Sequence, residues 1–256
     1  SVSAGEPHHC ADICSADIGD IIPENADAMV HLAAVSRDED CRKDPRRAFE
    51  INVGGTLNLV RAARTRKIRQ FIFASSEWVY GEVANDAIQA EDSVIDAGKI
   101  KSEYALTKIV GERLLAMACG QDSFSATVLR FGIVYGPRPA NWSAVETLFH
   151  AVRAQERVEV KGSLRTARRF IHVSDIASGI LGALGRTGFE IFNLSGDRLV
   201  TLKDVIDESS ALTGRHPEII ERNPAAVSIR NPDNQKARKI LGWKPSMDLR
   251  QGLSTL

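Results

Sequence analysis

The sequence predicts a doubly wound α/β fold, in which a parallel sheet carries helices on both faces. Apolar runs of strand length occur at residues 26–35, 70–76 and 125–136. Segments with helical periodicity, residues 46–67 and 102–119, lie between them and are long enough to be crossover helices. The first run, "ADAMVHLAAV", is almost continuously apolar, as is typical of a strand covered on both faces. We expect a parallel sheet with a smaller α/β lobe in the C-terminal half.

The two N-terminal helices are predicted from the spacing of their apolar residues. The first follows Pro45 and has basic residues at its C-terminal end, where the helix dipole favours them. Its apolar positions are Phe49, Val53, Leu57 and Val60. The second helix begins near Ser102, and Gly120 is its expected stop. Its apolar positions include Ile109, Leu114 and Met117.

The C-terminal half is less regular. We expect a helix at residues 143–154 and one starting at Thr201, strands at 157–162 and 189–196, a strand-to-helix unit at 168–185, and a helix within 234–243. We predict that residues 1–140 and 169–196 form a dinucleotide-binding domain. Residues 141–168 and 197–256 then form the substrate-binding lobe.

The composition favours a soluble protein that binds small molecules. Of its 256 residues, 43% are hydrophobic, and 33 basic residues balance 33 acidic ones. No net field attracts nucleic acid or an anionic membrane, and no apolar run approaches the roughly 18 residues of a spanning helix. We expect a cytoplasmic protein with reduced cysteines. His8, His9, Cys10 and Cys14 lie close together, but no second pair of ligands follows, so we expect no metal site.

Tyr104 and Lys108 are the first candidates for chemistry. They are four residues apart in a predicted helix, so they share one face. An ammonium close to a phenol stabilises the phenolate and lowers the pKa of the phenol, which lets the tyrosine accept a proton from an alcohol. Ser75 and Ser76 end the apolar run 70–76, and ligands of such sheets bind beyond the carboxyl ends of the strands. Tyr-x-x-x-Lys alone is weak evidence, because surface placement explains it equally well.

The order of seven motifs carries a more specific signal. They are "HLAA" (31–34), "NVGGT" (52–56), "SSEWVYG" (75–81), "YALTK" (104–108), "LRFGIVYGP" (129–137), "RRFIHVSDIA" (168–177) and "LGWKP" (241–245). Together they resemble the extended short-chain dehydrogenase/reductase family, the Rossmann-like nucleotide-sugar epimerases and dehydratases. The resemblance covers nearly the whole chain from Asp12 onward.

The resemblance implies roles for individual residues. Tyr104 is the catalytic acid/base, Lys108 its modulator and a ligand of the nicotinamide ribose, and Ser76 the third catalytic residue. Substrate contacts are implied for Ser76, Glu77, Trp78, Arg168 and Arg222, with Arg168 gripping the diphosphate. His31 and His172 are expected to be framework residues. Besides Tyr104 and Lys108, the implied cofactor contacts are Asp12, Ile13, Leu32, Ala33, Ala34, Asn52, Ser75 and Ile133.

The first departure from the family pattern is the N-terminus. The chain has no Gly-x-x-Gly-x-x-Gly turn, which rests a pyrophosphate on a helix N-terminus. We expect that the given sequence lacks a segment of the native protein and that the fold is N-terminally incomplete. If the chain truly starts at Ser1, a catalytically silent nucleotide-sugar-binding protein becomes the alternative. The expected cofactor is NAD, and NADP is not excluded, because the residue that chooses between them would lie in that segment.

Two further departures concern the substrate. Dehydratases and decarboxylases of the family carry a glutamate where this chain has Trp78, and that acid assists elimination. Relatives also have a substrate-contacting asparagine at the position of Ile133, so the exact sugar stays open. We therefore expect C4 epimerisation of a UDP- or dTDP-hexose, with a keto-sugar reductase or a dehydratase as the alternatives. The helices around 47–66 and 102–119 resemble those that pair in family dimers, so a homodimer is expected.

Overall fold

The computed structural model describes residues 9–83, 86–119, 124–154 and 157–256. The predictions made for His8 and Gly120 lie outside these residues. The chain forms two compact units, each of which is described by itself. Unit 1 comprises Ser1–Ala74, Ser102–Val128 and Gly185–Glu190, and unit 2 comprises Ser75–Lys101, Leu129–Leu184 and Ile191–Leu256. The functional division into a dinucleotide domain and a substrate lobe stays a prediction.

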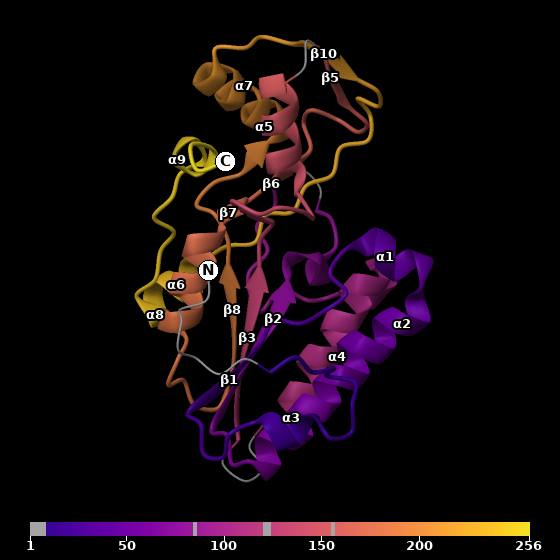
Figure 1. Cartoon of the computed structure of the whole chain (residues 1–256). Coiled ribbons are helices and arrows are strands. Elements are labelled where there is room, and N and C mark those ends of the chain that lie inside the picture. Colours follow the sequence, from indigo (N-terminus) through magenta and orange to yellow (C-terminus); the bar gives the residue numbers. More distant parts are fainter. Residues whose placement is uncertain (1–8, 84–85, 120–123, 155–156) are drawn as a thin grey trace. The chain divides into compact units, whose positions relative to one another are not determined.

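The central sheet has four strands in the order β1-β2-β3-β8 (Figure 1). They are β1 (Ala28–His31), β2 (Gln70–Ser76), β3 (Ser125–Phe131) and β8 (Phe189–Leu194). β1 and β2 are parallel, with Ala28 opposite Gln70. β2 is buried along its whole length, as a strand covered on both faces must be. The expected parallel α/β sheet is confirmed.

The prediction for residues 26–35 is wrong in extent and in burial. The strand spans only Ala28–His31, and the side chains of Val30 and Leu32 are 39% and 56% exposed. Within the described part of the chain, β1 is the last strand on its side of the sheet and pairs with β2 alone. A strand with one neighbour lacks half of the side-chain contacts that would bury it, so an apolar run does not guarantee burial.

In unit 1, η1 precedes β1, helices α1 to α3 follow β1, and α4 follows β2. Helices α2, α3 and α4 lie side by side (Figure 1). Gly111 of α4 lies against Phe73 of β2, where an added Cβ would be 2.7 Å from the ring. The elements are η1 (Ile18–Ile21), α1 (Asp38–Lys43), α2 (Pro45–Phe49), the π-helical segment η2 (Glu50–Gly55), α3 (Thr56–Thr65) and α4 (Glu103–Ala118).

The helix predicted at residues 46–67 is present but interrupted by η2. A π-turn adds a residue to the ordinary helical repeat, so side chains beyond it rotate away from the expected face. Leu57, just beyond η2, is exposed, whereas Asn52 and Thr56 are buried and Val60 is buried as predicted. Phe49, which precedes η2, is exposed as well. The apolar stripe expected on α4 is also not its buried face, because Met117 is 72% exposed while Lys108 and Glu112 are buried.

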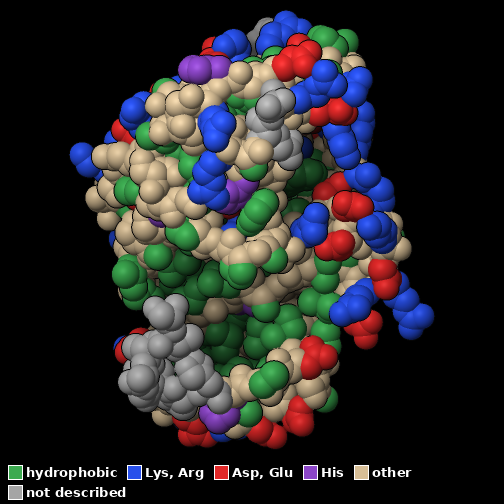
Figure 2. Space-filling model, turned by 45° about the horizontal axis from the view of Figure 1, so that its top comes forward, with side chains coloured by type: hydrophobic (Ala, Val, Ile, Leu, Met, Phe, Trp, Pro, Cys, Tyr) green, Lys and Arg blue, Asp and Glu red, His purple; other side chains and the backbone are tan. Residues whose placement is uncertain are grey.

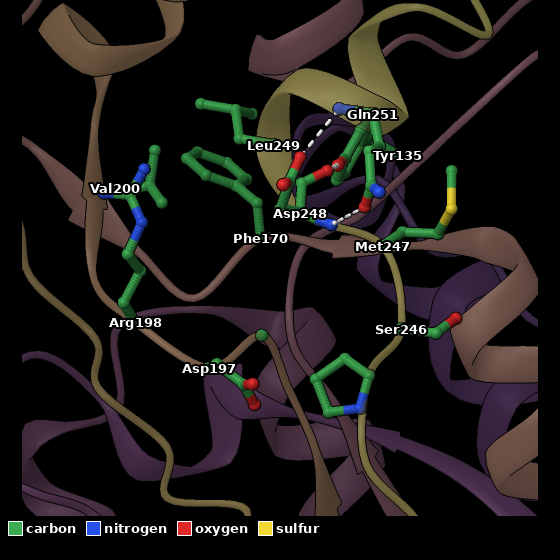
Figure 3. A pocket seen from close by; sticks show the side chains of 12 residues that line it. Tyr135, Phe170, Asp197, Arg198, Val200, Ser246, Met247, Asp248, Leu249 and Gln251 are labelled. Carbon is green, nitrogen blue, oxygen red and sulfur yellow. Dashed lines mark hydrogen bonds between the residues drawn. The ribbon is translucent and has the colours of Figure 1, made fainter.

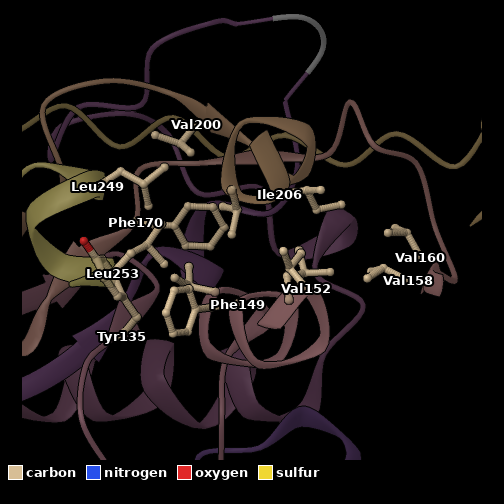
Figure 4. Close-up of a cluster of buried hydrophobic side chains, with 13 residues drawn as sticks. Tyr135, Phe149, Val152, Val158, Val160, Phe170, Val200, Ile206, Leu249 and Leu253 are labelled. Carbon is tan, nitrogen blue, oxygen red and sulfur yellow. The ribbon is translucent and has the colours of Figure 1, made fainter. Parts of the chain in front are cut away.

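Unit 2 is built around helices α5 and α7, which pack against each other (Figure 4). Its hydrophobic core joins Tyr135, Phe149, Phe170 and Ile206 with the C-terminal Leu253. The elements are η3 (Glu77–Tyr80), η4 (Ala97–Lys99), β4 (Val134–Tyr135), α5 (Ala144–Ala154), β5 (Arg157–Val160), β6 (Ala167–Arg168), β7 (Ile171–His172), α6 (Val173–Gly182), β9 (Val200–Thr201), α7 (Leu202–Thr213), β10 (Glu218–Glu221), α8 (Gln235–Leu241) and α9 (Leu249–Leu253).

Short two-stranded pairs complete unit 2. β5 pairs with β10 and β4 with β7 in parallel, and β6 pairs with β9 in antiparallel orientation. The predicted C-terminal helices and strands are all present. No helix in the described ranges is long and apolar enough to cross a membrane. On the face displayed in Figure 2, basic and acidic side chains are intermixed, in line with the balanced charge.

Candidate functional site

The predicted site residues divide between the two units. Those of unit 1 are Asp12, Ile13, Leu32, Ala33, Ala34, Asn52, Tyr104 and Lys108. Those of unit 2 are Ser75, Ser76, Glu77, Trp78, Ile133, Arg168 and Arg222. The structure allows each group to be described within its own unit.

Lys108 and Tyr104 share one face of α4, as their spacing predicts. The Lys108 ammonium lies 5.7 Å from the centre of the Tyr104 ring and 4.8 Å from that of Phe73. Its Nζ donates a hydrogen bond of 2.8 Å to the carbonyl oxygen of Ala74. The side chain is only 3% exposed, and this burial lowers the pKa of Lys108 to about 8. A buried lysine fixed beside a phenol is a feature of chemistry rather than of a solvated helix surface.

Asn52 holds the loop that follows β1. Its Oδ1 accepts from the backbone N–H of Val35 at 2.8 Å, and its Nδ2 donates to the Val35 carbonyl at 3.0 Å. Nδ2 also donates to the Thr107 hydroxyl of α4. Asn52 thereby ties the loop to the helix that carries Tyr104. The loop residues Leu32 and Ala33 are exposed, so the surface predicted to contact the cofactor is open in unit 1.

His31 is a framework residue, as expected. The Thr56 hydroxyl donates to the Asn52 carbonyl at 2.6 Å, so it accepts from Nε2–H of His31 at 3.0 Å. Burial, assisted by the positive charge of Lys108, lowers the pKa of His31 to about 4. The ring is therefore neutral near pH 7 and serves as a hydrogen-bond donor in the core.

Asp12 and Ile13 belong to a turn at the start of the described chain. The Asp12 carboxylate accepts from the Cys14 N–H at 2.9 Å. Ile13 packs on Gly55, where an added Cβ would lie 2.6 Å from the isoleucine Cδ1. A larger residue at the second glycine of "NVGGT" would force the Ile13 side chain to move. The predicted adenine contact of Asp12 and Ile13 stays a prediction.

The end of β2 shows what "SSEWVYG" does structurally. Ser76 is the last strand residue, and its Oγ accepts from the Trp78 N–H at 3.3 Å, capping the single 3₁₀ turn η3. Gly81 ends the turn with φ of 68°, a conformation that glycine adopts without strain. The Tyr80 hydroxyl donates to Oδ1 of buried Asn193 at 2.8 Å. The motif is therefore a rigid turn that presents Ser76, Glu77 and Trp78 in fixed positions.

Glu77 is the most unusual residue of this turn. Its side chain is completely buried, and its nearest charges are Arg168 Nε at 3.5 Å and Arg230 Nη1 at 4.0 Å. Neither carboxylate oxygen accepts a hydrogen bond from a described residue. Burial raises the pKa of Glu77 to about 7, although both arginines favour its charged form. The Arg230 guanidinium also stacks on the Trp78 ring, 4.1 Å from its centre.

Arg168 and Arg222 have different surroundings. The Arg168 guanidinium is nearly buried and donates to the Ser228 carbonyl and hydroxyl. Arg222 is exposed and forms an ion pair with Glu159 at 2.8 Å. Ile133 is half-buried, and its carbonyl accepts from the Ile171 N–H. Of these three residues, Arg168 is the one that the structure joins to Glu77.

A cavity of about 270 Å³ lies elsewhere in unit 2 (Figure 3). Tyr135, Phe170 and Leu249 form an apolar wall, and Arg198 and Asp197 lie on its other side. None of the predicted site residues lines it. We do not assign it as the reaction site, because neither the tyrosine–lysine pair nor the turn at 76–81 lines it.

Sequence reasoning missed Arg230. It lies in the extended segment "SIRNPDN", which has neither helical nor strand periodicity. Its guanidinium nevertheless reaches Glu77 and Trp78, and it is only 7% exposed. Because Arg230 lies in a segment without helical or strand periodicity, no sequence pattern predicts that it is buried. Only the structure shows it.

The structure thus combines a central sheet of the α/β class with a tyrosine–lysine pair on α4. A family model described as "NAD dependent epimerase/dehydratase family" matches residues 3–195. The chain belongs to this family.

Relatives and solved structures of several activities are similar to the chain. UDP-glucuronate 4-epimerase of Thermodesulfobacterium geofontis is 27% identical over 229 residues, which is 88% of this chain and 70% of that protein. The structure of UDP-glucose 4-epimerase from Thermotoga maritima with UDP-glucose gives a TM-score of 0.86 at 25% identity, covering 96% of this chain and 81% of the other. The Pseudomonas aeruginosa protein RMD, complexed with NADPH, gives 0.87 at 26%, covering 96% and 86%.

Proposed function

We propose that the protein is an NAD-dependent epimerase that inverts C4 of a UDP- or dTDP-hexose. The observation that carries the proposal is the buried Lys108 ammonium beside the Tyr104 ring on α4. Relatives that epimerise UDP-sugars support the substrate class. A relative that is a GDP-6-deoxy-D-mannose reductase shows that the family fold also serves reduction.

Tyr104 is proposed as the general base for the sugar hydroxyl. Lys108, protonated below its pKa of about 8, favours the phenolate by its charge and lowers the cost of removing the proton. Ser76 is proposed to orient the same oxygen. Its hydroxyl proton is available for this, because Oγ acts as an acceptor toward Trp78.

The residues of unit 1 fit a dinucleotide in part. The open surface of Leu32, Ala33 and Ala34, fixed by Asn52, and the Lys108 ammonium would hold NAD, with NADP not excluded. Asp12 and Ile13 of unit 1 are proposed adenine contacts, and Ser75 and Ile133, which belong to unit 2, are proposed as further cofactor contacts. When bound, NAD accepts the hydride of the sugar carbon and returns it.

The turn at 76–81 favours epimerisation over elimination. Elimination of water needs an acid at the leaving group, and an indole N–H at residue 78 cannot transfer a proton at neutral pH. The Arg230 guanidinium lies over this indole, 4.1 Å from the ring centre, and the large apolar ring is proposed to contact the sugar. Glu77 keeps a dehydratase as the second candidate, because a carboxyl with a pKa of about 7 can donate a proton near neutrality.

The two candidates give different products. The protein is incubated with NAD and UDP-glucose, UDP-glucuronate or dTDP-glucose, and the products are followed by proton NMR. We expect a changed anomeric signal without a new C6 methyl doublet. A methyl doublet formed from a hexose would show loss of water and would refute the epimerase in favour of the dehydratase.

We further propose that the protein is a cytoplasmic homodimer. The side chains of Leu57 and Met117 are 46% and 72% exposed on helices α3 and α4 of unit 1. Large apolar side chains that stay exposed on adjacent helices are typical of a surface covered in an assembly.

A further inference from the structure

Glu77, Arg168, Arg230 and Trp78 form a buried charged cluster in unit 2. The Glu77 side chain has no exposed surface, and those of Arg168 and Arg230 are 11% and 7% exposed. The closest approaches of the carboxylate to the guanidiniums are 3.5 and 4.0 Å, longer than the 2.7–2.9 Å typical of a hydrogen-bonded pair. The carboxylate is therefore close enough to neutralise the arginines but accepts no hydrogen bond from a described residue.

The charges around Glu77 come from three segments. Arg168 lies on β6, Arg230 lies in the extended segment after β10, and Glu82 follows η3. Glu82 is 57% exposed and 4.0 Å from Arg230, and it accepts a hydrogen bond from the Ser228 hydroxyl, which itself accepts from Arg168. Burial and, secondly, the positive charge of Arg230 disfavour the charge on Arg168 and lower its pKa to about 10. Both guanidiniums lie within 4.0 Å of the Glu77 carboxylate, and two positive charges in such a buried place require a nearby negative charge.

We propose that Glu77 is the internal counter-ion of Arg168 and Arg230 and that it takes up a proton when an anionic group of the substrate binds at these arginines. The inference rests on the proposed nucleotide-sugar substrate. Two anions close together in a buried site repel each other, so the arriving group favours protonation of Glu77. The anion is either a phosphate of the diphosphate or a carboxylate on the sugar, since a guanidinium recognises both.

The arrangement determines how the affinity for the anion changes with pH. Above pH 7 Glu77 is charged in the free protein, so each bound anion must be accompanied by up to one proton. The dissociation constant then rises by up to about tenfold for each pH unit between 7 and 9. The diphosphate of a nucleotide sugar has one strongly acidic hydroxyl on each phosphorus, so its own charge does not change over this range.

The counter-ion is first tested without ligand. Difference infrared spectroscopy of the protein should show a carboxyl C=O band that grows as the pH falls through about 7. The band should be missing in Glu77→Gln and unchanged in Glu218→Gln, a control at an exposed carboxylate of the same unit that pairs with Arg157. A wild-type protein without such a band would overturn the proposal.

The anion site is tested by calorimetric titration at pH 7, 8 and 9 in two buffers of different ionisation enthalpy. The probes are sulfate, UDP-glucose and UDP-glucuronate. We expect proton uptake with the wild type and Glu218→Gln. Glu77→Gln should bind at least about fivefold more tightly at pH 8 with no proton uptake, and Arg230→Gln should bind more weakly at every pH. Uptake that is equal for both nucleotide sugars identifies the diphosphate, and uptake seen only with UDP-glucuronate identifies a sugar carboxylate.

The results separate this inference from the proposed function. Sulfate binding with Glu77-dependent proton uptake, in a protein that binds neither nucleotide sugar, would support the anion site and refute the nucleotide-sugar substrate. Nucleotide-sugar binding with the same pH dependence in wild type and Glu77→Gln would refute the counter-ion alone. Failure of all three probes to bind would overturn both.

Discussion

Replacement of Lys108 by methionine should change the pH dependence of stability in a calculable way. The buried ammonium is disfavoured in the folded state, which lowers the pKa of Lys108 from 10.5 to about 8. At about 1.4 kcal/mol for each pKa unit, this lowering costs about 3 kcal/mol of stability at pH 7. Methionine has similar length and no charge, so Lys108→Met removes the cost. It also removes the hydrogen bond to Ala74, which offsets part of the gain by about 1.5–3 kcal/mol.

The change in the free energy of unfolding with pH does not depend on the lost hydrogen bond to Ala74. Between pH 8 and 10.5 the unfolded state binds more protons at residue 108 than the folded state does, so the stability of the wild type rises with pH there. Lys108→Met lacks this rise. We expect the wild type to gain about 2.5 kcal/mol relative to the variant between pH 7 and pH 10.

Urea unfolding followed by circular dichroism at pH 7, 8, 9 and 10 measures this difference. Lys203→Met is the control, because Lys203 is 61% exposed on α7 and forms an ion pair with Asp207. The difference in stability between this variant and the wild type should change little with pH. A difference for Lys108→Met that changes by less than about 0.5 kcal/mol over this range would show that the ammonium is well solvated and would refute the argument from burial.

Two further predictions concern assembly and local stability. Light scattering at micromolar concentration should show a dimer for the wild type and a monomer for the double variant Leu57→Lys, Met117→Lys. Val94→Lys is the control and should stay dimeric, because Val94 is 93% exposed and lies in unit 2. A monomeric wild type would disprove the dimer. Thr201→Ala should lower the free energy of unfolding by about 1 kcal/mol in urea titrations, because it removes the capping box that Thr201 forms with Asp204 at the start of α7; an unchanged midpoint would mean that the cap does not contribute.

The regular elements of the fold could be predicted because their signals are local. β2, α4, α5 and α7 each have a continuous apolar run or a helical pattern together with a cap, such as Ser102 at α4. The π-helical segment was not predictable in this way. Its residues Glu50–Gly55 look helical, and only the extra residue per turn moves Leu57 off the buried face.

The site was predictable where it follows a spacing and not where it depends on long-range contacts. Tyr104 and Lys108 are four apart, so the helix alone brings them to one face. The burial of Lys108 depends on Phe73 and Ala74, which belong to another element. Arg230 reaches Glu77 across about 150 positions of sequence, as 230 − 77 = 153, and no periodicity encodes such a pair.

The central claim is that Tyr104 is the general base of a nucleotide-sugar epimerase. Its most direct test compares the rates at which the wild type and Tyr104→Phe convert UDP-glucose or UDP-glucuronate to the C4 epimer in the presence of NAD. The conversion is followed by proton NMR, and binding of the sugar nucleotide is measured by calorimetry. Such a base contributes about 100-fold to 10,000-fold, and phenylalanine removes a single hydroxyl. The account predicts unchanged binding with less than about one hundredth of the wild-type rate. A variant that binds normally and keeps more than about a tenth of the rate would contradict it.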